Sequence, residues 1–412
     1  MKVIGIIAEY NPFHFGHLHH LNQSKELTGS THSIAVMSGN FVQRGEPAII
    51  DKWARAEMAI KNGIDLVFEL PFVFATSSAE YFGEAGVKLL DSLGIVECVS
   101  YGSETGSSEQ IEKAAEFLAE ENEDFRILLK KNLSEGLSFP FAREKALTKI
   151  APGLGDVLNH SNNILAVEYI KAAKRIGSKM DFVPIMRVGS NFNESSLDNH
   201  SFCSATAIRK ELYKGDSCNV NKTMPYESFK ILMDSESESC NSSYPRKEDL
   251  FNCLQYKIRT AGNEKLASIA GMREGLENRL MSAAYKSLDY TSFIKMVESK
   301  RYPKSSVQRL LLHLLLDLKK SELNEFRNAD SPYARVLGFN DKGKQLLKEI
   351  KKKSDAMIIT NVNRQKPDTE LLQKMLEYDI KATDFYMLLM MWKGCKSVES
   401  QDRVRAPYIQ WK

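Results

Sequence analysis

The fold of this chain is decided near its start, where residues 3–17 read VIGIIAEYNPFHFGH. The apolar run Val3–Ala8 is typical of a buried β-strand, and it stops at the charged Glu9. The chain then turns through Asn-Pro, and we expect a helix to begin near Gly16-His17. A strand, a tight turn and a helix form the opening unit of a parallel α/β sheet, which binds its ligands beyond the carboxyl ends of its strands.

Strands and helices continue to alternate through the first half of the chain. We predict strands at residues 33–37, 65–69, 95–101 and 182–187, and helices at residues 17–25, 53–62, 107–131 and 163–175. Such alternation indicates β-α-β units with right-handed crossovers. The expected fold class is therefore α/β, with a Rossmann-like parallel-sheet domain.

A polar stretch at residues 233–245 interrupts this pattern and is typical of a linker or loop. Beyond it the chain is mainly helical by pattern, and residues 310–318 and 386–392 are so apolar that they must be buried. We therefore predict a catalytic domain at residues 1–232 and a mainly α-helical C-terminal domain at residues 246–412.

The net charge of +3 on 412 residues hides an asymmetry. Residues 1–240 carry 24 Lys+Arg and 32 Asp+Glu, a net −8, and residues 241–412 carry 32 and 21, a net +11. A basic half that is otherwise well folded suits a polyanionic partner. A lysine-rich helical surface in water would give the same count, so charge alone leaves both interpretations open.

Composition excludes several classes of protein. The six cysteines form no C-x-x-C pair, which argues against a disulfide framework or a zinc ribbon and fits a reduced cytoplasmic compartment. No apolar run approaches the roughly 18 residues of a membrane span. Nothing in the sequence points to an obligate protein partner.

The H-x-G-H motif of His14, Gly16 and His17 carries the chemistry. A helix start offers free N–H groups and the positive end of the helix dipole, so it attracts phosphate. Two imidazoles three residues apart can face one phosphate and donate hydrogen bonds to the charge that builds on an α-phosphate during nucleotidyl transfer. We expect in-line attack on that phosphorus, with ATP as substrate and Mg²⁺ accompanying the departing pyrophosphate.

Two alternatives compete with this interpretation. His14, His17, His19 and His20 lie within seven residues and could form a metal site, but no carboxylate or thiol completes the set with zinc-like spacing. We therefore predict no resident metal at these histidines, and expect His19 and His20 to be surface or supporting residues. A structural accident is the other alternative, because the tetrapeptide alone is a weak signal.

A second motif, Ser204-Ala205-Thr206-Ala207-Ile208-Arg209, opens a later helix. Ser204 and Thr206 can cap that helix and bind phosphate oxygens, while Arg209 offers a fork to the β- and γ-phosphates. Alone, this would be an ordinary N-cap with a surface arginine; beside H-x-G-H, it favours a triphosphate site.

This pair of motifs resembles the signature of the nucleotidylyltransferase superfamily. Class I aminoacyl-tRNA synthetases share the first motif but carry K-M-S-K-S as the second, which residues 295–299 (KMVES) match poorly. The runs EYNPFHFGH, VMSGNFVQRGEPA, DLVFELP, YGSE, SNNIL, SATAIRK, REGLENR, KRYP and PYARVLGF are similar to those of the bacterial tRNA(Met) cytidine acetate ligase family. The resemblance covers the chain from Val3 to about Phe339.

The resemblance implies an enzyme that forms acetyl-adenylate from ATP and acetate and then acetylates N4 of the wobble cytidine of elongator tRNA(Met). His14 and His17 would be catalytic. The implied ATP site comprises residues 7–20, namely Ile7, Ala8, Glu9, Tyr10, Asn11, Pro12, Phe13, His14, Phe15, Gly16, His17, Leu18, His19 and His20, with Gly102, Asn162 and Arg187. The second motif adds Ser204, Thr206 and Arg209 to the expected ATP-binding residues. Phe15 is a departure, since relatives often carry a small polar residue there.

Cations stand beside aromatic residues at two places in the basic half. Lys300, Arg301 and Lys304 flank Tyr302, and Arg335 follows Tyr333. Cations fix phosphates and aromatic rings stack on bases, so we predict tRNA contacts at the four cations. Lys52 and Arg55, at the start of a helix in the first half, fit a solvated face better than a phosphate contact.

Two rival functions remain. A small-molecule cofactor adenylyltransferase would use the same ATP site but would not need the +11 half. A non-enzymatic RNA-binding protein would need that half, but not an intact set of His14, Gly16, His17 and Arg209.

Overall fold

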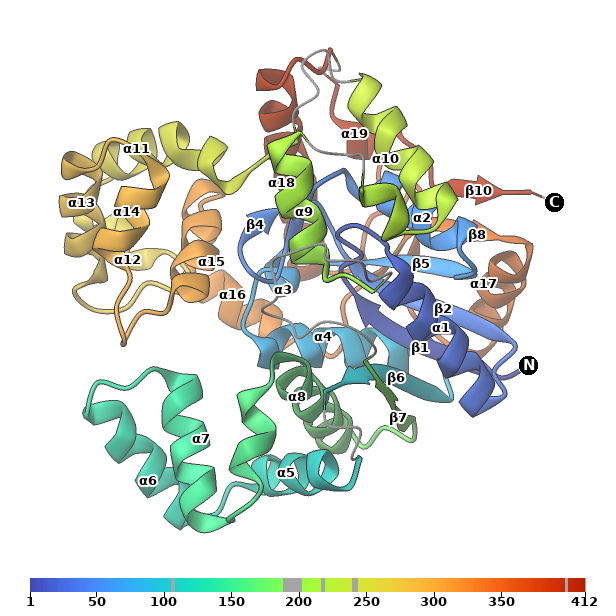
Figure 1. Ribbon diagram of the computed structural model, residues 1–412, viewed down its shortest axis with the longest axis horizontal. Coiled ribbons are helices and arrows are strands. Elements are labelled where there is room, and N and C mark those ends of the chain that lie inside the picture. The colour runs from blue at the N-terminus through green and yellow to red at the C-terminus, as the bar shows by residue number, and fades with distance from the viewer. Residues whose placement is uncertain (105–107, 188–201, 216–218, 239–243, 397–398, 412) are drawn as a thin grey trace.

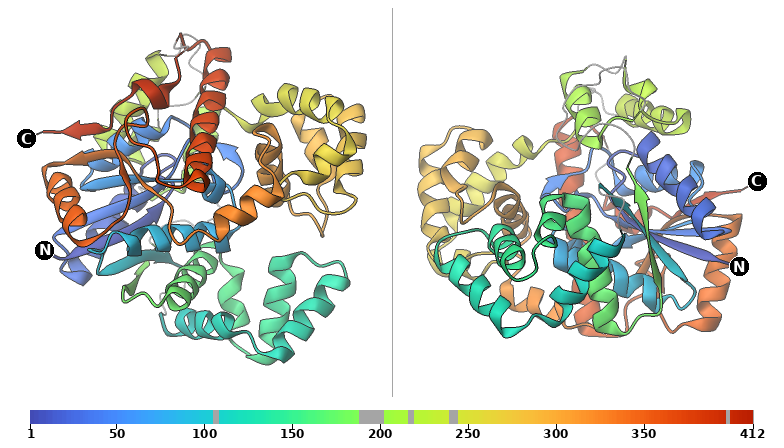
Figure 2. Two further views of the ribbon diagram at one scale, coloured as in Figure 1. Left: turned by 180° about the vertical axis from the view of Figure 1, so that it is seen from behind. Right: turned by 60° about the horizontal axis from the view of Figure 1, so that its bottom comes forward.

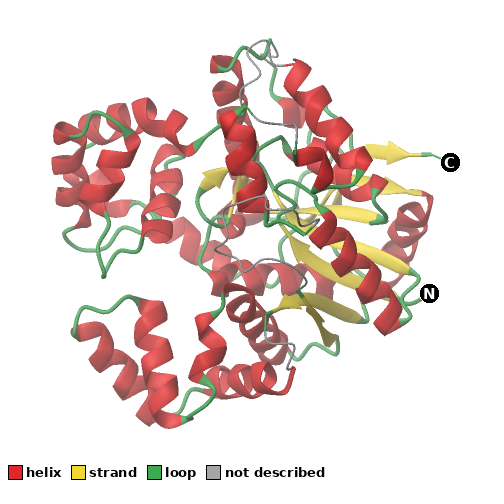
Figure 3. Ribbon diagram, viewed as in Figure 1, coloured by secondary structure: helices red, strands yellow, loops and turns green. Residues whose placement is uncertain are grey.

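The computed structural model describes residues 1–411 apart from 105–107, 188–201, 216–218, 239–243 and 397–398. A mixed sheet forms its centre, with strand order β10-β8-β5-β2-β1-β6-β7, and β9 pairs with β8. The strands are β1 (Val3–Ala8), β2 (His32–Ser38), β5 (Leu66–Leu70), β6 (Cys98–Ser103), β7 (Asp181–Met186), β8 (Ala334–Asn340), β9 (Ile358–Ile359) and β10 (Tyr408–Gln410). The predicted α/β fold class is confirmed (Figure 3).

All pairs along this sheet are parallel except β5 with β8. β3 (Phe41–Val42) and β4 (Glu46–Pro47) form a separate antiparallel pair in the loop after β2. Because β1 pairs with both β2 and β6, its carboxyl end lies centrally among those of the parallel strands, where ligands of such sheets bind.

Helices cover both faces of the sheet. In the first half they are α1 (Phe15–Thr28), α2 (Lys52–Lys61), α3 (Phe72–Ala75), α4 (Ala79–Ser92), α5 (Ser108–Glu120), α6 (Glu123–Ser134), α7 (Phe139–Ile150), α8 (Ser161–Ile176), α9 (Ala205–Lys214) and α10 (Tyr226–Glu238). Ile34 and Val36 of β2 pack with α4, α8, α17 and α18, whereas Ala35 and Met37 pack with α1, α2, α9 and α10. Successive strand side chains point to opposite faces, so β2 contributes to both cores.

The second half contains α11 (Phe251–Thr260), α12 (Asn263–Ser268), α13 (Leu276–Lys286), α14 (Tyr290–Val297), α15 (Lys304–Leu315), α16 (Lys320–Arg327), α17 (Asp341–Lys353), α18 (Glu370–Trp392) and α19 (Gln401–Val404). Short 3₁₀ helices lie at Gly155–Asn159, Val220–Lys222 and Lys247–Leu250. Two helical groups, α6–α7 and α11–α14, stand on the same side of the molecule, away from the sheet, while α5 packs against α8 (Figures 1 and 2).

The structure differs from the sequence predictions at three places. The helix expected over residues 107–131 is broken at Asn122, whose side chain caps α6 by accepting a hydrogen bond from the Phe125 N–H at 2.9 Å. The C-terminal region is not wholly helical, because β8, β9 and β10 join the first-half sheet beside β5. Residues 233–238 continue α10, and residues 239–243 of the expected linker lie outside the described part.

Candidate active site

The two histidines of the H-x-G-H motif cap the start of α1. His14 is the N-cap residue, and its Nδ1 accepts a hydrogen bond from the Gly16 N–H at 3.0 Å. His17 Nδ1 accepts one from the backbone N–H of His14 at 3.3 Å. A Cβ on Gly16 would lie 2.8 Å from Cε1 of His14, so glycine is required for the cap itself. The imidazoles replace the Ser/Thr and Glu side chains of an ordinary capping box.

Burial keeps both imidazoles neutral. It lowers the pKa of His14 to about 3, with further lowering by the charges of Arg187 and Arg209. Burial also holds the pKa of His17 well below its ordinary value, and His14 and Arg187 add to that effect. Because each Nδ1 accepts a hydrogen bond, the proton of each neutral ring resides on Nε2. The pair, with ring centroids 3.8 Å apart, therefore presents two N–H donors without a full charge.

Arg55 holds the loops on which this cap is built. Its fully buried guanidinium donates to the carbonyl oxygens of Glu9 at 2.6 Å and Ser38 at 3.1 Å, and to that of Gly39. It thereby ties the end of β1 to the end of β2. The expectation of a solvated face at Lys52 and Arg55 is wrong, because both side chains are fully buried at structural positions.

The second motif reaches the first from α9. Ser204 Oγ caps this helix by accepting a hydrogen bond from the Ala207 N–H at 3.2 Å, as predicted. Arg209 Nη1 donates to the carbonyl oxygen of Asn11 at 2.7 Å, and Nη2 lies 3.4 Å from Thr206 Oγ. The structure thus brings residues almost 200 positions apart in the sequence to one loop.

Both motifs open onto a cavity of about 1600 Å³. Its lining includes the predicted residues Ile7, Ala8, Glu9, Tyr10, Asn11, His14, Gly16, His17, His19, His20, Gly102, Asn162, Arg187, Ser204, Thr206 and Arg209. Pro12, Phe13, Phe15 and Leu18 do not line it. Phe13 and Leu18 instead pack in the core between the sheet and α1, and the Phe15 N–H donates to the carbonyl oxygen of Thr223, so these residues shape the turn.

Glu104, just after β6, lies against the start of α8. The Asn162 side-chain amide donates to Glu104 Oε1 at 2.5 Å, and the Glu104 N–H donates to Asn163 Oδ1 at 3.2 Å. Glu104 Oε2 is buried and has no hydrogen-bond partner among the described residues. A buried carboxylate oxygen in this state suits a hydroxyl donor such as that of a ribose.

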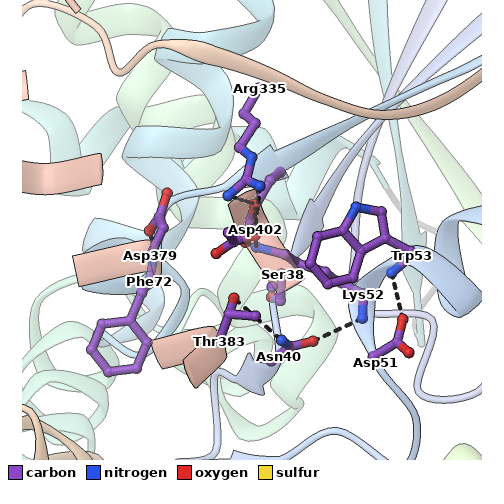
Figure 4. A network of polar contacts seen from close by, with 12 residues as sticks. Ser38, Asn40, Asp51, Lys52, Trp53, Phe72, Arg335, Asp379, Thr383 and Asp402 are labelled. Carbon is purple, nitrogen blue, oxygen red and sulfur yellow. Dashed lines mark hydrogen bonds and ion pairs between the residues drawn. The ribbon is translucent and has the colours of Figure 1, made fainter. Parts of the chain in front are cut away.

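Arg335 belongs to a buried ion network rather than to an RNA-facing surface (Figure 4). It lies 3.1 Å from Glu69 and 2.5 Å from Asp402, and Lys52 lies 2.8 Å from each of the same two carboxylates. The predicted tRNA contact at Arg335 does not fit the structure, because its side chain is only 5% exposed and both its partners are internal. Sequence proximity to an aromatic residue did not distinguish a buried arginine from a solvent-facing one.

The other predicted RNA-binding cations divide between two environments. Arg301 and Lys304, at the start of α15, line the same cavity as the histidines. Lys300 is exposed and does not line it. The segment around Tyr302 therefore brings the basic half of the chain to the same cavity as the H-x-G-H motif.

The described residues contain no group of three or more His, Cys, Asp or Glu side chains arranged to hold a metal ion. Burial lowers the pKa of His20 to about 4, and His19 contacts Phe202 edge to face. In the same described part, none of the helices is both long enough and apolar enough to cross a membrane.

The site defines the chain as a nucleotidyl transferase of the H-x-G-H class, and the model of the HIGH Nucleotidyl Transferase family matches residues 1–402. The tRNA(Met) cytidine acetate ligase of Thermoanaerobacter sp. (strain X514) is 47% identical over 397 residues, covering 94% of this chain and 95% of the relative. That of Caldanaerobacter subterraneus subsp. tengcongensis is 45% identical over 391 residues, with the same coverage. The chain therefore belongs to the tRNA(Met) cytidine acetate ligase family, as its motifs predicted.

Solved structures agree with this assignment. The crystal structure of apo Thermotoga maritima TmcAL matches with a TM-score of 0.93 at 35% identity, covering 100% of both chains. The structure of Thermotoga maritima TmcAL bound with alpha-thio ATP matches with a TM-score of 0.92 at 36% identity and the same coverage.

Proposed function

We propose that this chain is an ATP-dependent ligase that forms acetyl-adenylate and transfers the acetyl group to N4 of the wobble cytidine of elongator tRNA(Met). The observation that carries this proposal is the pair of neutral, buried imidazoles whose Nε2–H groups are free to donate into a cavity also lined by Arg209. The choice of acetate and tRNA(Met) as substrates is supported by membership of the tRNA(Met) cytidine acetate ligase family. Since its substrate is tRNA, we place the enzyme in the cytoplasm.

The first step joins acetate to AMP. A carboxylate oxygen of acetate attacks the α-phosphorus of ATP, the bond to the bridging oxygen breaks, and pyrophosphate leaves. His14 and His17 donate from Nε2 to the non-bridging α-phosphate oxygens, where negative charge builds in the transition state. Neutral donors suit this role because they need no counter-ion before the nucleotide binds.

Arg209 and Arg187 supply the positive charge that faces the triphosphate. Arg209 is anchored on the Asn11 carbonyl, so its remaining N–H groups can reach phosphate oxygens without reordering the side chain. Mg²⁺ would be held mainly by the phosphate oxygens and water, since the described residues offer no cluster of three acidic or imidazole ligands. When bound, the ion would neutralise charge on the departing pyrophosphate.

The second step needs RNA at the same cavity. The cytidine N4 attacks the acetyl carbonyl carbon, the acyl–phosphate bond breaks, AMP leaves, and N4 loses a proton. An exposed single-stranded loop can turn its base out of the stack to enter such a site. Arg301 and Lys304, which line the cavity from the basic half, would contact the RNA backbone.

The test has two parts. Purified protein should catalyse ATP–pyrophosphate exchange that depends on acetate, and should convert cytidine to N4-acetylcytidine in transcribed tRNA(Met), detected by mass spectrometry of nucleosides. Exchange driven by nicotinate mononucleotide or phosphopantetheine in place of acetate would refute the proposal in favour of cofactor synthesis.

A further inference from the structure

The cavity wall supplied by the basic half carries more positive charge than the nucleotide site needs. Seven cations from this half line the cavity, and two of them have partners across it: Lys247 pairs with Glu46 at 3.1 Å, and Arg246 donates to the carbonyl oxygen of Tyr213. The other five are Arg273, Arg301, Lys304, Arg309 and Arg327. Among the described residues, no carboxylate oxygen lies within 4.0 Å of a side-chain nitrogen of these five residues, so none of the five forms an ion pair. The triphosphate is already faced by Arg187 and Arg209 from the histidine side. The unneutralised wall therefore suits a second anionic substrate.

Arg309 and Arg327 form the recessed part of this wall, on α15 and α16, which lie between the sheet and the α11–α14 helices (Figure 1). Arg309 donates to the carbonyl oxygen of Gln43 at 3.3 Å and to Ser306 Oγ at 3.2 Å. Burial lowers its pKa to about 10, which still leaves it charged at neutral pH. Two of its donors are thus fixed on neutral oxygens, and its charge is not compensated.

Arg327 has an incomplete set of partners. Its guanidinium carbon lies 3.4 Å from the centre of the Tyr81 ring, so the group stacks on that ring. Its Nε is buried and has no hydrogen-bond partner within the described residues. A buried donor without an acceptor is costly, and an anionic ligand would remove that cost.

The groups that surround the two arginines do not neutralise them. His313 hydrogen-bonds Thr76 Oγ at 3.1 Å, and burial lowers its pKa to about 4, so it is uncharged at neutral pH. The carboxylates whose negative charge acts on Arg327 are those of Glu80 and Glu84.

Both carboxylates are already paired with lysine. Glu80 lies 2.8 Å from Lys171, and Glu84 lies 2.9 Å from Lys88. Each carboxylate thus has a lysine partner of its own, and among the described residues neither forms an ion pair with Arg327.

We propose that Arg309 and Arg327 bind a backbone phosphate of the RNA beside the target cytidine, inside the cavity, and so fix which nucleotide reaches the acyl-adenylate. This inference rests on the proposed function. A cavity of about 1600 Å³ exceeds the roughly 300–1000 Å³ of small-molecule sites, which leaves room for a nucleotide beside ATP. One guanidinium group can give a phosphate two parallel hydrogen bonds, and the charges of Arg309 and Arg327 both act on His313.

The test removes charge from the protein and, separately, from the RNA. Arg309→Gln and Arg327→Gln are compared with Lys286→Gln, an exposed lysine of α13 that does not line the cavity. The substrates are a stem-loop RNA carrying the target cytidine and the same RNA with uncharged methylphosphonate linkages on either side of that cytidine. The measured quantity is the ratio of RNA acetylation to acetate-dependent ATP–pyrophosphate exchange.

We expect each arginine substitution to lower this ratio by about tenfold or more, and Lys286→Gln to leave it unchanged. The uncharged linkage should lower the ratio for the wild type by a similar factor and add little to the loss in Arg309→Gln. The salt dependence of RNA binding should weaken by about 0.7 in log–log slope for the lost contact. Arg309→Lys, which keeps the charge but not the fork, should be intermediate.

Three results would overturn the inference. The first is an unchanged ratio of acetylation to exchange in both arginine variants. The second is full additivity of the losses caused by the arginine substitution and by the uncharged RNA linkage. The third is an equal loss of exchange and acetylation, which would mean that the arginines serve the adenylation site or the stability of the fold. A wild-type protein that exchanges pyrophosphate but acetylates no RNA would instead refute the proposed function.

Discussion

We propose two separable roles for His14, and one substitution should remove only one of them. Its Nδ1 caps α1 by accepting a hydrogen bond from the Gly16 N–H at 3.0 Å, while its Nε2–H would be the donor to the α-phosphate. Asparagine is among the best N-cap residues, so His14→Asn keeps an acceptor for the cap and loses the second donor. His14→Ala loses both.

The magnitudes follow from these contacts. Loss of a donor to a developing oxyanion costs about 100- to 1000-fold in rate, or about 2.7–4 kcal/mol. Loss of an N-cap costs about 1 kcal/mol of stability. Both variants should therefore lose acetate-dependent ATP–pyrophosphate exchange by about 100-fold or more, but only His14→Ala should unfold at a lower temperature, by about 1–2 °C in a chain of this size.

The assays are exchange kinetics at saturating ATP and thermal unfolding without nucleotide. Near-normal exchange in His14→Asn would refute the catalytic role of the imidazole. Equal thermal stability of the wild type, His14→Asn and His14→Ala would refute the capping role and, with it, the assignment of the proton to Nε2.

Three further predictions concern charge. Because the pKa values of His14 and His17 are lowered in the folded protein, only the unfolded chain binds protons at these residues just below about pH 6.5, and stability is lost as the pH falls. For His14, whose folded pKa is about 3, the loss of stability at pH 5 is about 2 kcal/mol. The His14→Asn substitution should therefore flatten the measured pH dependence of thermal unfolding. Burial, and after it the charge of Glu69, raises the pKa of Asp379 to about 8, so this carboxyl group is mostly neutral at pH 7. Asp379→Asn should therefore change stability by less than about 1 kcal/mol, whereas Asp402→Asn should cost about 3–5 kcal/mol because it leaves buried cations without a partner. If thermal unfolding ranked the two variants in the opposite order, the network described above would be contradicted. Arg209→Lys, which loses the planar fork, should raise the KM for ATP in exchange by about tenfold while leaving thermal unfolding nearly unchanged.

The sequence predicted the parts of the site that are local. Val3–Ala8 had to be a strand because it is an unbroken apolar run, and the H-x-G-H turn had to follow it at the carboxyl end. The capping role of Ser204 was also readable, since an N-cap depends on residues three positions apart. The contact between Arg209 and Asn11 was expected only as a shared phosphate site, and the structure adds the direct hydrogen bond.

The sequence failed where a residue's partners lie far along the chain. Lys52 and Arg335 stand among mainly apolar neighbours in the sequence, but nothing local shows which carboxylates would allow a charged side chain to be buried there. Their burial depends on Glu69 and Asp402, which meet them only because β8 pairs antiparallel with β5 and the C-terminal segment returns to the sheet. Tertiary pairing of this kind has no periodic signal.

The buried network explains why the C-terminal segment belongs to the catalytic unit. Burial alone would raise the pKa of Asp402, but the charges of Lys52 and Arg335 outweigh it and hold that pKa at about 2, so the carboxylate stays ionised. Because the raised pKa of Asp379 keeps that group mostly neutral, the cations Lys52 and Arg335 face the two carboxyl groups of Glu69 and Asp402, so cations and acidic partners match in number.

This set of charges is joined through Lys52 to Asn40, in the loop that follows β2 (Figure 4). The Lys52 N–H donates to Asn40 Oδ1 at 2.8 Å, and Asn40 lies two residues beyond Ser38 at the end of β2. Arg55, one helical turn after Lys52, holds the Ser38 carbonyl and also that of Glu9, from which the H-x-G-H turn departs. The position of the two histidines of the H-x-G-H motif is thus coupled through α2 to Asp402, about 390 residues away in the sequence, which makes the candidate active site a product of both halves of the chain.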